Sequence, residues 1–182
     1  MFLPQRDTIE KFMRESNAIE GEFPSLKTIR YRGDKNNDKS YHRLGRLNKH
    51  DMEAAFWFLA QDTLTQDIVR ELHRKLAKER DDLKPQLSNP GDYRKWNLEF
   101  PKNTSMWTLL PALMGNYFLD IDKMDAWTAH WKFEKIHPFE DLNGRTGRLI
   151  WLHKMLQTGD DWFLKYPFQQ MYYYQTLDHQ KL

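Results

Sequence analysis

Apolar residues recur at helical spacing along most of this chain of 182 residues. The clearest run, from about Gln66 to Glu79, places its apolar side chains on one face of a helix. These side chains are Ile68, Val69, Leu72 and Leu76. Because a chain of this length forms one core comfortably and two poorly, we expect a single domain of the mainly α class.

The same spacing predicts further helices, separated by glycine and proline. They cover residues 7–17, a segment beginning at Asp51, and residues 106–119, 123–136, 143–157 and 167–177. Asp7 is the predicted N-cap of the first helix, and Gly159 is predicted to stop the helix at 143–157. Between residues 81 and 105 the pattern changes. Trp96, Leu98 and Phe100 alternate there, which predicts a short strand or one arm of a hairpin.

Composition excludes several classes of function. The net charge of +2 favours neither nucleic acid nor an anionic membrane as a partner. No apolar run of 18 residues is present, and the N-terminus has no cleavable apolar leader, so we expect neither a membrane span nor a signal peptide. The chain has no cysteine, which rules out disulfides and thiolate metal sites and fits a cytoplasmic location.

The segment from His137 to Arg148 concentrates the chemistry of the chain. It reads HPFEDLNGRTGR and leads directly into an apolar helical segment. It therefore places an imidazole, a carboxylate, two glycines and two arginines where a loop becomes a helix N-terminus. Backbone N–H groups are unpaired at such a position, and anions bind there.

These residue types fit the transfer of a phosphate-containing group. His137 can act as a base, since an imidazole is mostly neutral at pH 7. Asp141 offers the kind of single carboxylate that magnesium uses together with phosphate oxygens. Gly144 permits close approach of backbone to phosphate, while Arg145 and Arg148 share one helical face. Each feature is weak alone, but the combination in this order favours an anion site beside a base.

The segment resembles the signature of the Fic family, which reads His-Pro-Phe-x-Asp/Glu-Gly-Asn-Gly/Lys-Arg-x-x-Arg. Every defined position matches except Leu142, where the family usually has glycine. The resemblance implies a helical domain with a small β-hairpin flap. It also implies a protein adenylyltransferase (AMPylase), which moves AMP from ATP to a Ser, Thr or Tyr hydroxyl of a target protein with the help of Mg²⁺.

The resemblance also implies a role for each matching residue. His137 would activate the target hydroxyl, Phe139 would anchor the loop in the core, and Asp141 would bind the magnesium. The residues that bind the nucleotide phosphates would be Asn143, Gly144, Arg145, Gly147 and Arg148. Within this group, Arg148 would meet the γ-phosphate.

Leu142 leaves two alternatives open. If this position needs a positive φ, leucine costs about 1 kcal/mol or more there, and its branched side chain could narrow the nucleotide entrance. The protein would then transfer another phosphate-containing group, such as UMP or phosphate, or it would be an inactive nucleotide-binding module. Gly144 favours AMP transfer, because lysine at that position marks a phosphotransferase within the family.

A second segment, Ser16 to Gly21, resembles the inhibitory motif of the family, Ser/Thr-x-x-x-Glu-Gly/Asn. Glu20 would then pair with Arg148 and repel the γ-phosphate, with Ser16 as part of the same motif. The alternative is that Glu20 and Gly21 only end a helix.

A third segment, Gly91 to Arg94 followed by Leu98 and Phe100, resembles the approach to the family's flap, which docks the target backbone by strand addition. An ordinary turn and edge strand is the alternative. We expect an inhibitory segment at residues 7–21, a catalytic core at about 49–157 and a C-terminal helix within 158–182. The expected partners are ATP and a hydroxyl-bearing protein, with neither membrane nor nucleic acid, and a homo-oligomer is left open.

Overall fold

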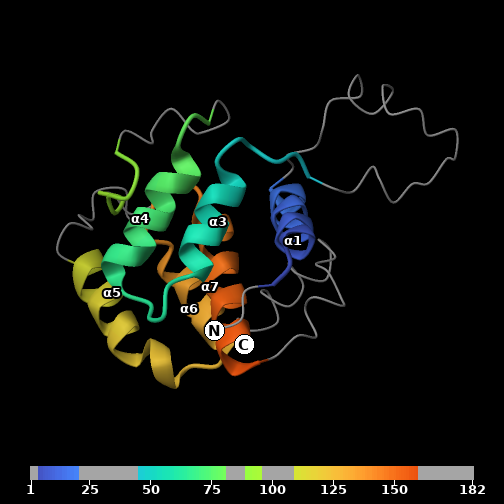
Figure 1. The fold of residues 1–182 in the computed structure, drawn as a ribbon. Helices are drawn as coiled ribbons and strands as arrows, with labels where there is room; N and C mark the ends of the chain where they lie inside the picture. The colour runs from blue at the N-terminus through green and yellow to red at the C-terminus, as the bar shows by residue number, and fades with distance from the viewer. Residues whose placement is uncertain (1–3, 21–44, 81–88, 96–108, 160–182) are drawn as a thin grey trace, which may run out of the picture.

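The computed structural model describes residues 4–20, 45–80, 89–95 and 109–159, and these form a helical bundle (Figure 1). Its elements are α1 (Arg6–Ile19), α3 (Asp51–Leu59), α4 (Gln66–Ala77), α5 (Leu109–Asp120), the 3-10 helix η2 (Ile121–Lys123), α6 (Ala126–Ile136) and α7 (Asn143–Thr158). The prediction of a mainly α fold is confirmed. The predicted flap with Leu98 and Phe100, and the predicted helix at 167–177, lie outside the described residues.

Helix α7 is the centre of the bundle. It packs against α1, α3, α4 and α6, and Figure 1 shows it in the middle of the molecule with α3 beside it. Nearly all of its side chains from Arg145 to Met155 are buried, so it lacks a solvent-facing stripe. A helix enclosed in this way holds its N-terminus in a fixed place.

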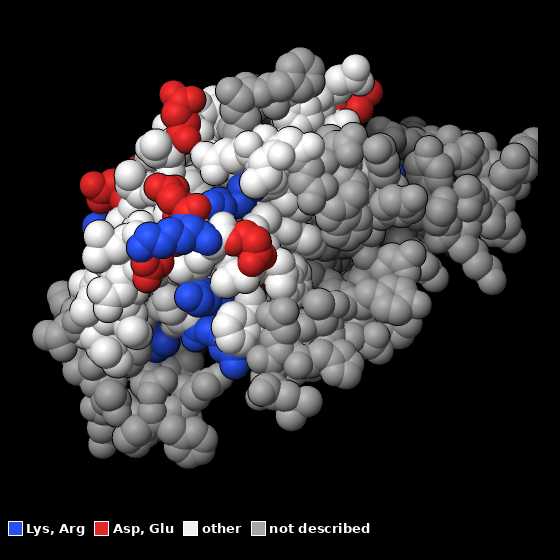
Figure 2. Space-filling view, turned by 90° about the horizontal axis from the view of Figure 1, so that it is seen from below, with Lys and Arg blue, Asp and Glu red and all other residues white. Residues whose placement is uncertain are grey.

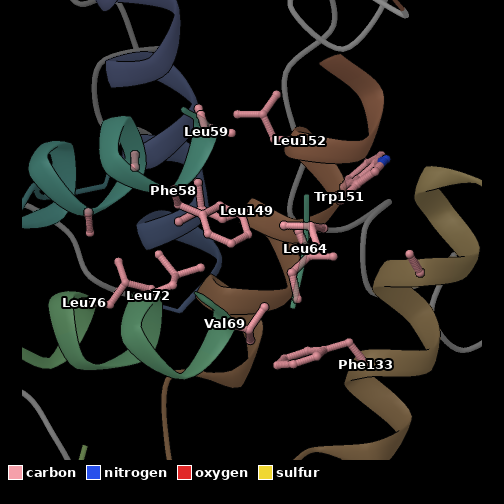
Figure 3. Close-up of a cluster of buried hydrophobic side chains, with 14 of the residues drawn as sticks. Phe58, Leu59, Leu64, Val69, Leu72, Leu76, Phe133, Leu149, Trp151 and Leu152 are labelled. Atoms are coloured by element: carbon pink, nitrogen blue, oxygen red, sulfur yellow. The ribbon is translucent and has the colours of Figure 1, made fainter. Parts of the chain in front are cut away.

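The hydrophobic core joins α3, α4, α6 and α7 (Figure 3). The buried side chains labelled in that view are Phe58, Leu59, Leu64, Val69, Leu72, Leu76, Phe133, Leu149, Trp151 and Leu152. Phe139 and Leu142, from the loop between α6 and α7, belong to the same cluster. The loop between α6 and α7 is therefore anchored in the core by these two side chains.

Hydrogen bonds from polar groups of helix α1 hold it against the rest of the domain. Asn17 Nδ2 donates to Asp51 Oδ2 and to the Arg46 carbonyl, each at 2.7 Å. The Gly45 N–H donates to the Arg14 carbonyl at 2.9 Å, so closely that a Cβ at Gly45 would overlap that carbonyl. Any movement at the end of α1 therefore starts from a helix that is itself fixed.

Two predicted helix starts are wrong. Asp7 lies inside the first turn of α1, and the N-cap is Gln5, whose carbonyl accepts from the amides of residues 8 and 9. The helix predicted from residue 123 begins at Ala126, because Asp125 accepts the Thr128 N–H at 2.9 Å and caps it. Periodicity identifies a helix better than it identifies the first residue.

Charges of both signs share the surface. Figure 2, seen from below, shows acidic and basic side chains interspersed over the part of that face that the structure describes. This mixture agrees with the small net charge of the chain. Among the described helices, none combines the length and apolar composition that a membrane span requires.

Candidate active site

The loop between α6 and α7 begins and ends with a residue in the left-handed conformation. His137, at the C-terminal end of α6, has φ 48° and ψ 60°, and Leu142, at the N-cap of α7, has φ 61° and ψ 9°. For residues other than glycine, this conformation costs about 1 kcal/mol or more. Such a loop persists only where its surroundings hold it.

Arg94 holds the start of the loop. Its Nε donates to the His137 carbonyl at 2.6 Å, its Nη2 to the Ile136 carbonyl at 3.3 Å, and its backbone N–H to the Pro138 carbonyl at 2.8 Å. The last carbonyl groups of a helix lack intrahelical donors and lie at the negative end of its dipole. The buried guanidinium therefore satisfies the C-terminus of α6 and fixes the backbone of His137.

Asn143 closes the loop from the other side. Its Oδ1 accepts the Phe139 N–H and its Nδ2 donates to the Phe139 carbonyl, both at 2.9 Å. The ring of Phe139 is fully buried in the core. The side chain predicted to face phosphate is thus engaged within the loop, and Asn143 gives the loop its shape.

His73 supports the same loop, a role that the sequence did not reveal. Its ring stacks on Phe139 at a centroid distance of 3.9 Å, and its Nε2 lies 3.1 Å from the Asp141 carbonyl. Because its Nδ1 accepts the Gly91 N–H at 2.8 Å, Nε2 must carry the proton and donate to Asp141. The neutral ring of His73 is therefore part of the packing and hydrogen bonding that support the loop.

Acid should destabilise the protein through His73. Burial lowers the pKa of this imidazole to about 4, from the ordinary 6.5. Below pH 6.5 the His73 imidazole is protonated in the unfolded chain but stays neutral in the folded protein. The contribution of neutral His73 to the free energy of unfolding is therefore complete above pH 6.5 and falls on acidification. Between pH 6 and 4.5, we expect the wild-type free energy of unfolding to fall by about 1.2 kcal/mol per pH unit more steeply than that of His73→Gln. Urea unfolding across this range measures both slopes, and equal slopes would contradict the assignment.

The structure brings the predicted inhibitory pair together. Arg148 is 1% exposed, and its Nη2 donates to Glu20 Oε1 at 2.6 Å. The same guanidinium donates from Nε to Ser16 Oγ at 2.8 Å and from Nη2 to the Ser16 carbonyl at 3.1 Å. A Cβ at Gly144 would overlap Glu20 Oε1, so the carboxylate lies against the first turn of α7. The protein's own anion therefore occupies the helix N-terminus.

The electrostatics keep this anion charged. Burial alone would raise the pKa of Glu20, but Arg148 lowers it, with help from Arg145 and His137, and the net pKa is below the ordinary value. Burial also lowers the pKa of Arg145 to about 10, which leaves the guanidinium protonated at neutral pH. Two cations and an imidazole thus face one carboxylate.

Asp141 fits magnesium only in company with a phosphate. Its Oδ1 accepts the Leu142 N–H at 2.7 Å and lies 3.9 Å from Arg145 Nη2. In the part of the chain that the structure describes, no group of three or more His, Cys, Asp or Glu side chains could hold a metal ion. Magnesium is often bound by one or two carboxylates plus substrate phosphates, which matches a single aspartate beside an anion site.

Gly147 faces α6 instead of the Glu20 carboxylate. A Cβ there would lie 2.5 Å from Glu134 Oε1, 2.9 Å from His130 Nδ1 and 3.1 Å from the ring of Phe133. This glycine lets α6 and α7 approach closely. Its contribution to the site is the placement of α6, which ends at Ile136, immediately before His137.

Leu142 does require a positive φ, and its side chain, 2% exposed, packs into the core. Alanine would lose the buried contacts and keep the backbone strain, whereas glycine would lose the contacts and relieve the strain. We therefore expect Leu142→Ala to lower the free energy of unfolding by about 2–5 kcal/mol, and Leu142→Gly by about 1 kcal/mol less. Urea unfolding of both variants gives the order, and an alanine variant as stable as the glycine variant would remove strain from the explanation.

Comparison with known proteins identifies the family. The Fic/DOC family model matches residues 63–154, just over half of the chain. The chain therefore belongs to the Fic/DOC family, whose members are commonly transferases. No curated protein sequence matches it.

Solved structures share the fold. Fic-1 from C. elegans is 24% identical, with a TM-score of 0.58 over 85% of this chain and 49% of that one. A Fic family protein from Desulfovibrio desulfuricans is 18% identical, with a TM-score of 0.61 over 97% of this chain and 57% of that one. A Fic domain containing signaling protein from Bacteroides thetaiotaomicron is 22% identical, with a TM-score of 0.51 over 84% of this chain and 64% of that one. The chain thus spans about half to two thirds of their lengths.

Proposed function

We propose that this protein is an adenylyltransferase that moves AMP from ATP to a hydroxyl side chain of another protein, and that Glu20 restrains it. One observation carries the proposal. The Glu20 carboxylate lies against Gly144 at the start of α7 and accepts a hydrogen bond from the buried Arg148. Arg145 and His137 both help to lower the pKa of this carboxylate. A site that holds a carboxylate in this way has the donors and the charge that a phosphate group needs.

Nucleotide binding follows from displacement of that carboxylate. Once Glu20 turns away, Arg148 and Arg145 can pair with phosphate oxygens, and the backbone at Gly144 can approach them without a side chain in between. Since α1 is fixed to α3, release needs only a movement of Glu20 itself. Its side chain is 30% exposed and follows the last turn of α1.

The reaction requires a base, an aligned hydroxyl and a stabilised leaving group. The His137 imidazole takes the proton of the target hydroxyl, whose oxygen then bonds to the α-phosphorus while pyrophosphate leaves. The arginines stabilise the negative charge that shifts to the leaving group. Magnesium held by Asp141 and the phosphates would neutralise further charge.

Mass spectrometry of the Glu20→Gly protein after incubation with magnesium and ATP tests this function. We expect an adduct with the mass of AMP on the protein itself or on an added target, and none when His137→Ala is combined with Glu20→Gly. An adduct of phosphate mass, or one formed only from UTP, would replace AMP transfer with a different transferase activity. Nucleotide binding without any adduct would favour an inactive module.

A further inference from the structure

Three titratable side chains, at His130, Glu134 and His137, lie on the second half of α6 and at its C-cap. The spacing of four places His130 and Glu134 one turn apart on the helix, and His137 follows three residues later as the C-cap residue. Glu134 Oε1 lies 4.0 Å from His130 Nδ1, and Glu134 Oε2 lies 4.0 Å from His137 Nδ1. One carboxylate thus lies between the fully buried imidazole of His130 and the imidazole of His137.

Burying the Glu134 carboxylate at this position costs free energy. Its side chain is 16% exposed, and its Oε1 atom is buried without a hydrogen-bond partner among the residues that the structure describes. A buried carboxylate oxygen that lacks a donor costs free energy, and an apolar residue would pack against α7 without that cost. The other carboxylate oxygen, Oε2, faces the candidate base and lies 4.0 Å from His137 Nδ1.

We propose that Glu134 is a positioning residue for His137: its carboxylate accepts the Nδ1 proton and leaves Nε2 to face the target hydroxyl. This inference rests on the proposed transfer reaction. The distance of 4.0 Å exceeds a hydrogen bond by about 1 Å, and the His137 side chain, 43% exposed, has room to turn. Contacts between a base and its partner often tighten only when substrate is bound.

The proton balance of the reaction uses this arrangement. The hydroxyl proton passes to Nε2, Nδ1 keeps its own proton, and the resulting imidazolium lies against the Glu134 carboxylate while oxygen bonds to phosphorus and pyrophosphate departs. An adjacent negative charge stabilises the imidazolium and makes the ring a stronger base.

Glu20 and Glu134 are coupled. The charged or titratable groups facing Glu134 are His130 on α6, His137 at its C-cap, Tyr117 on α5, Arg148 on α7, and Glu20 after α1. Burial raises the pKa of Glu134 to about 7, Arg148 lowers it, and Glu20 raises it further. Departure of Glu20 therefore favours the ionised form of Glu134. The movement that frees Arg148 for phosphate also strengthens the base.

The tautomer of His137 gives a test that needs no nucleotide. Long-range proton–nitrogen NMR spectra of the Glu20→Gly protein at pH 8, assigned by the signals lost in His137→Ala, should show Nδ1 protonated. Glu134→Ala should shift His137 toward a mixture of tautomers. A protonated Nε2 in the parent protein, or no change in Glu134→Ala, would overturn the proposal. This result stands even if no AMP transfer is found, so the two proposals fail separately.

The pH dependence of kcat/KM supplies the second readout, again in the Glu20→Gly background. Glu134→Gln should move the acid limb of the profile to lower pH by about one unit, and lower the plateau on the order of tenfold or more. Glu140→Gln, which removes a carboxylate charge three residues beyond His137, is the matched control and should leave the limb in place. A lowered plateau with an unmoved limb in Glu134→Gln would indicate a structural role and contradict positioning.

Discussion

Replacing His137 with alanine should lower the rate of the proposed AMP transfer by a factor of about 10²–10⁴, the contribution typical of a general base. The substitution removes the imidazole and leaves the anion site intact. Arg145 and Arg148 remain buried beside Gly144, so the affinity for nucleotide should change little. The measurement is the initial rate of adduct formation in the Glu20→Gly background, together with a nucleotide dissociation constant from calorimetry.

His50→Ala is the matched control for this variant. The His50 ring pairs with Glu53 and Glu79 around the start of α3, and the substitution should leave the transfer rate unchanged. If His137→Ala retained more than about a tenth of the parent rate, the imidazole would not be the base. If it lost nucleotide affinity in proportion to rate, its role would be binding.

Replacing Glu20 with glycine should raise the rate of the proposed AMP transfer roughly 10- to 150-fold. The physical reason is the bond that must be broken before phosphate can enter. A hydrogen bond between charged groups contributes about 1.5–3 kcal/mol, and each 1.4 kcal/mol is about tenfold in an equilibrium. Rates of adduct formation at a nucleotide concentration below saturation measure the effect, because the competition between Glu20 and phosphate is greatest there.

A pair of charge-matched variants separates inhibition from a general change in α1. Glu20→Gln removes the charge that Arg148 recognises and should also activate. Glu10→Gln removes a carboxylate from the same helix, where it pairs with Arg14 at 2.8 Å, and should not activate. Equal labelling by wild type and the Glu20 variants would remove Glu20 from the control of the site.

The local pattern accounts for much of the fold. Helix α4 begins at the predicted Gln66, and α7 begins at the predicted Asn143 and is capped at Gly159, where φ is 72°. Periodicity and glycine act over a few residues, so a sequence displays them directly. The start of α6 was missed because Asp125, its cap, lies within an apolar pattern that reads as continuous helix.

The residues of the candidate site also fall into two groups, those predicted from the sequence and those seen only in the structure. His137, the two arginines and Glu20 were all predicted as site residues from two short motifs, because each motif keeps its residues close in sequence. Arg94 and His73 were not found, since they act through backbone carbonyls of a loop that is distant along the chain. A carbonyl group is common to every residue, so such a contact leaves no signature in either partner's sequence.

The residues themselves determine that this chain is helical, that a loop with an imidazole, a carboxylate, two glycines and two arginines precedes an apolar helix, and that Leu142 departs from the family pattern. Tertiary structure alone decides which groups meet. It brings Glu20 to Arg148, places Glu134 between two imidazoles, and turns the Leu142 side chain into the core. The physical reason is range: propensity and capping act within a few residues, whereas burial and charge act on whatever the packed helices bring together.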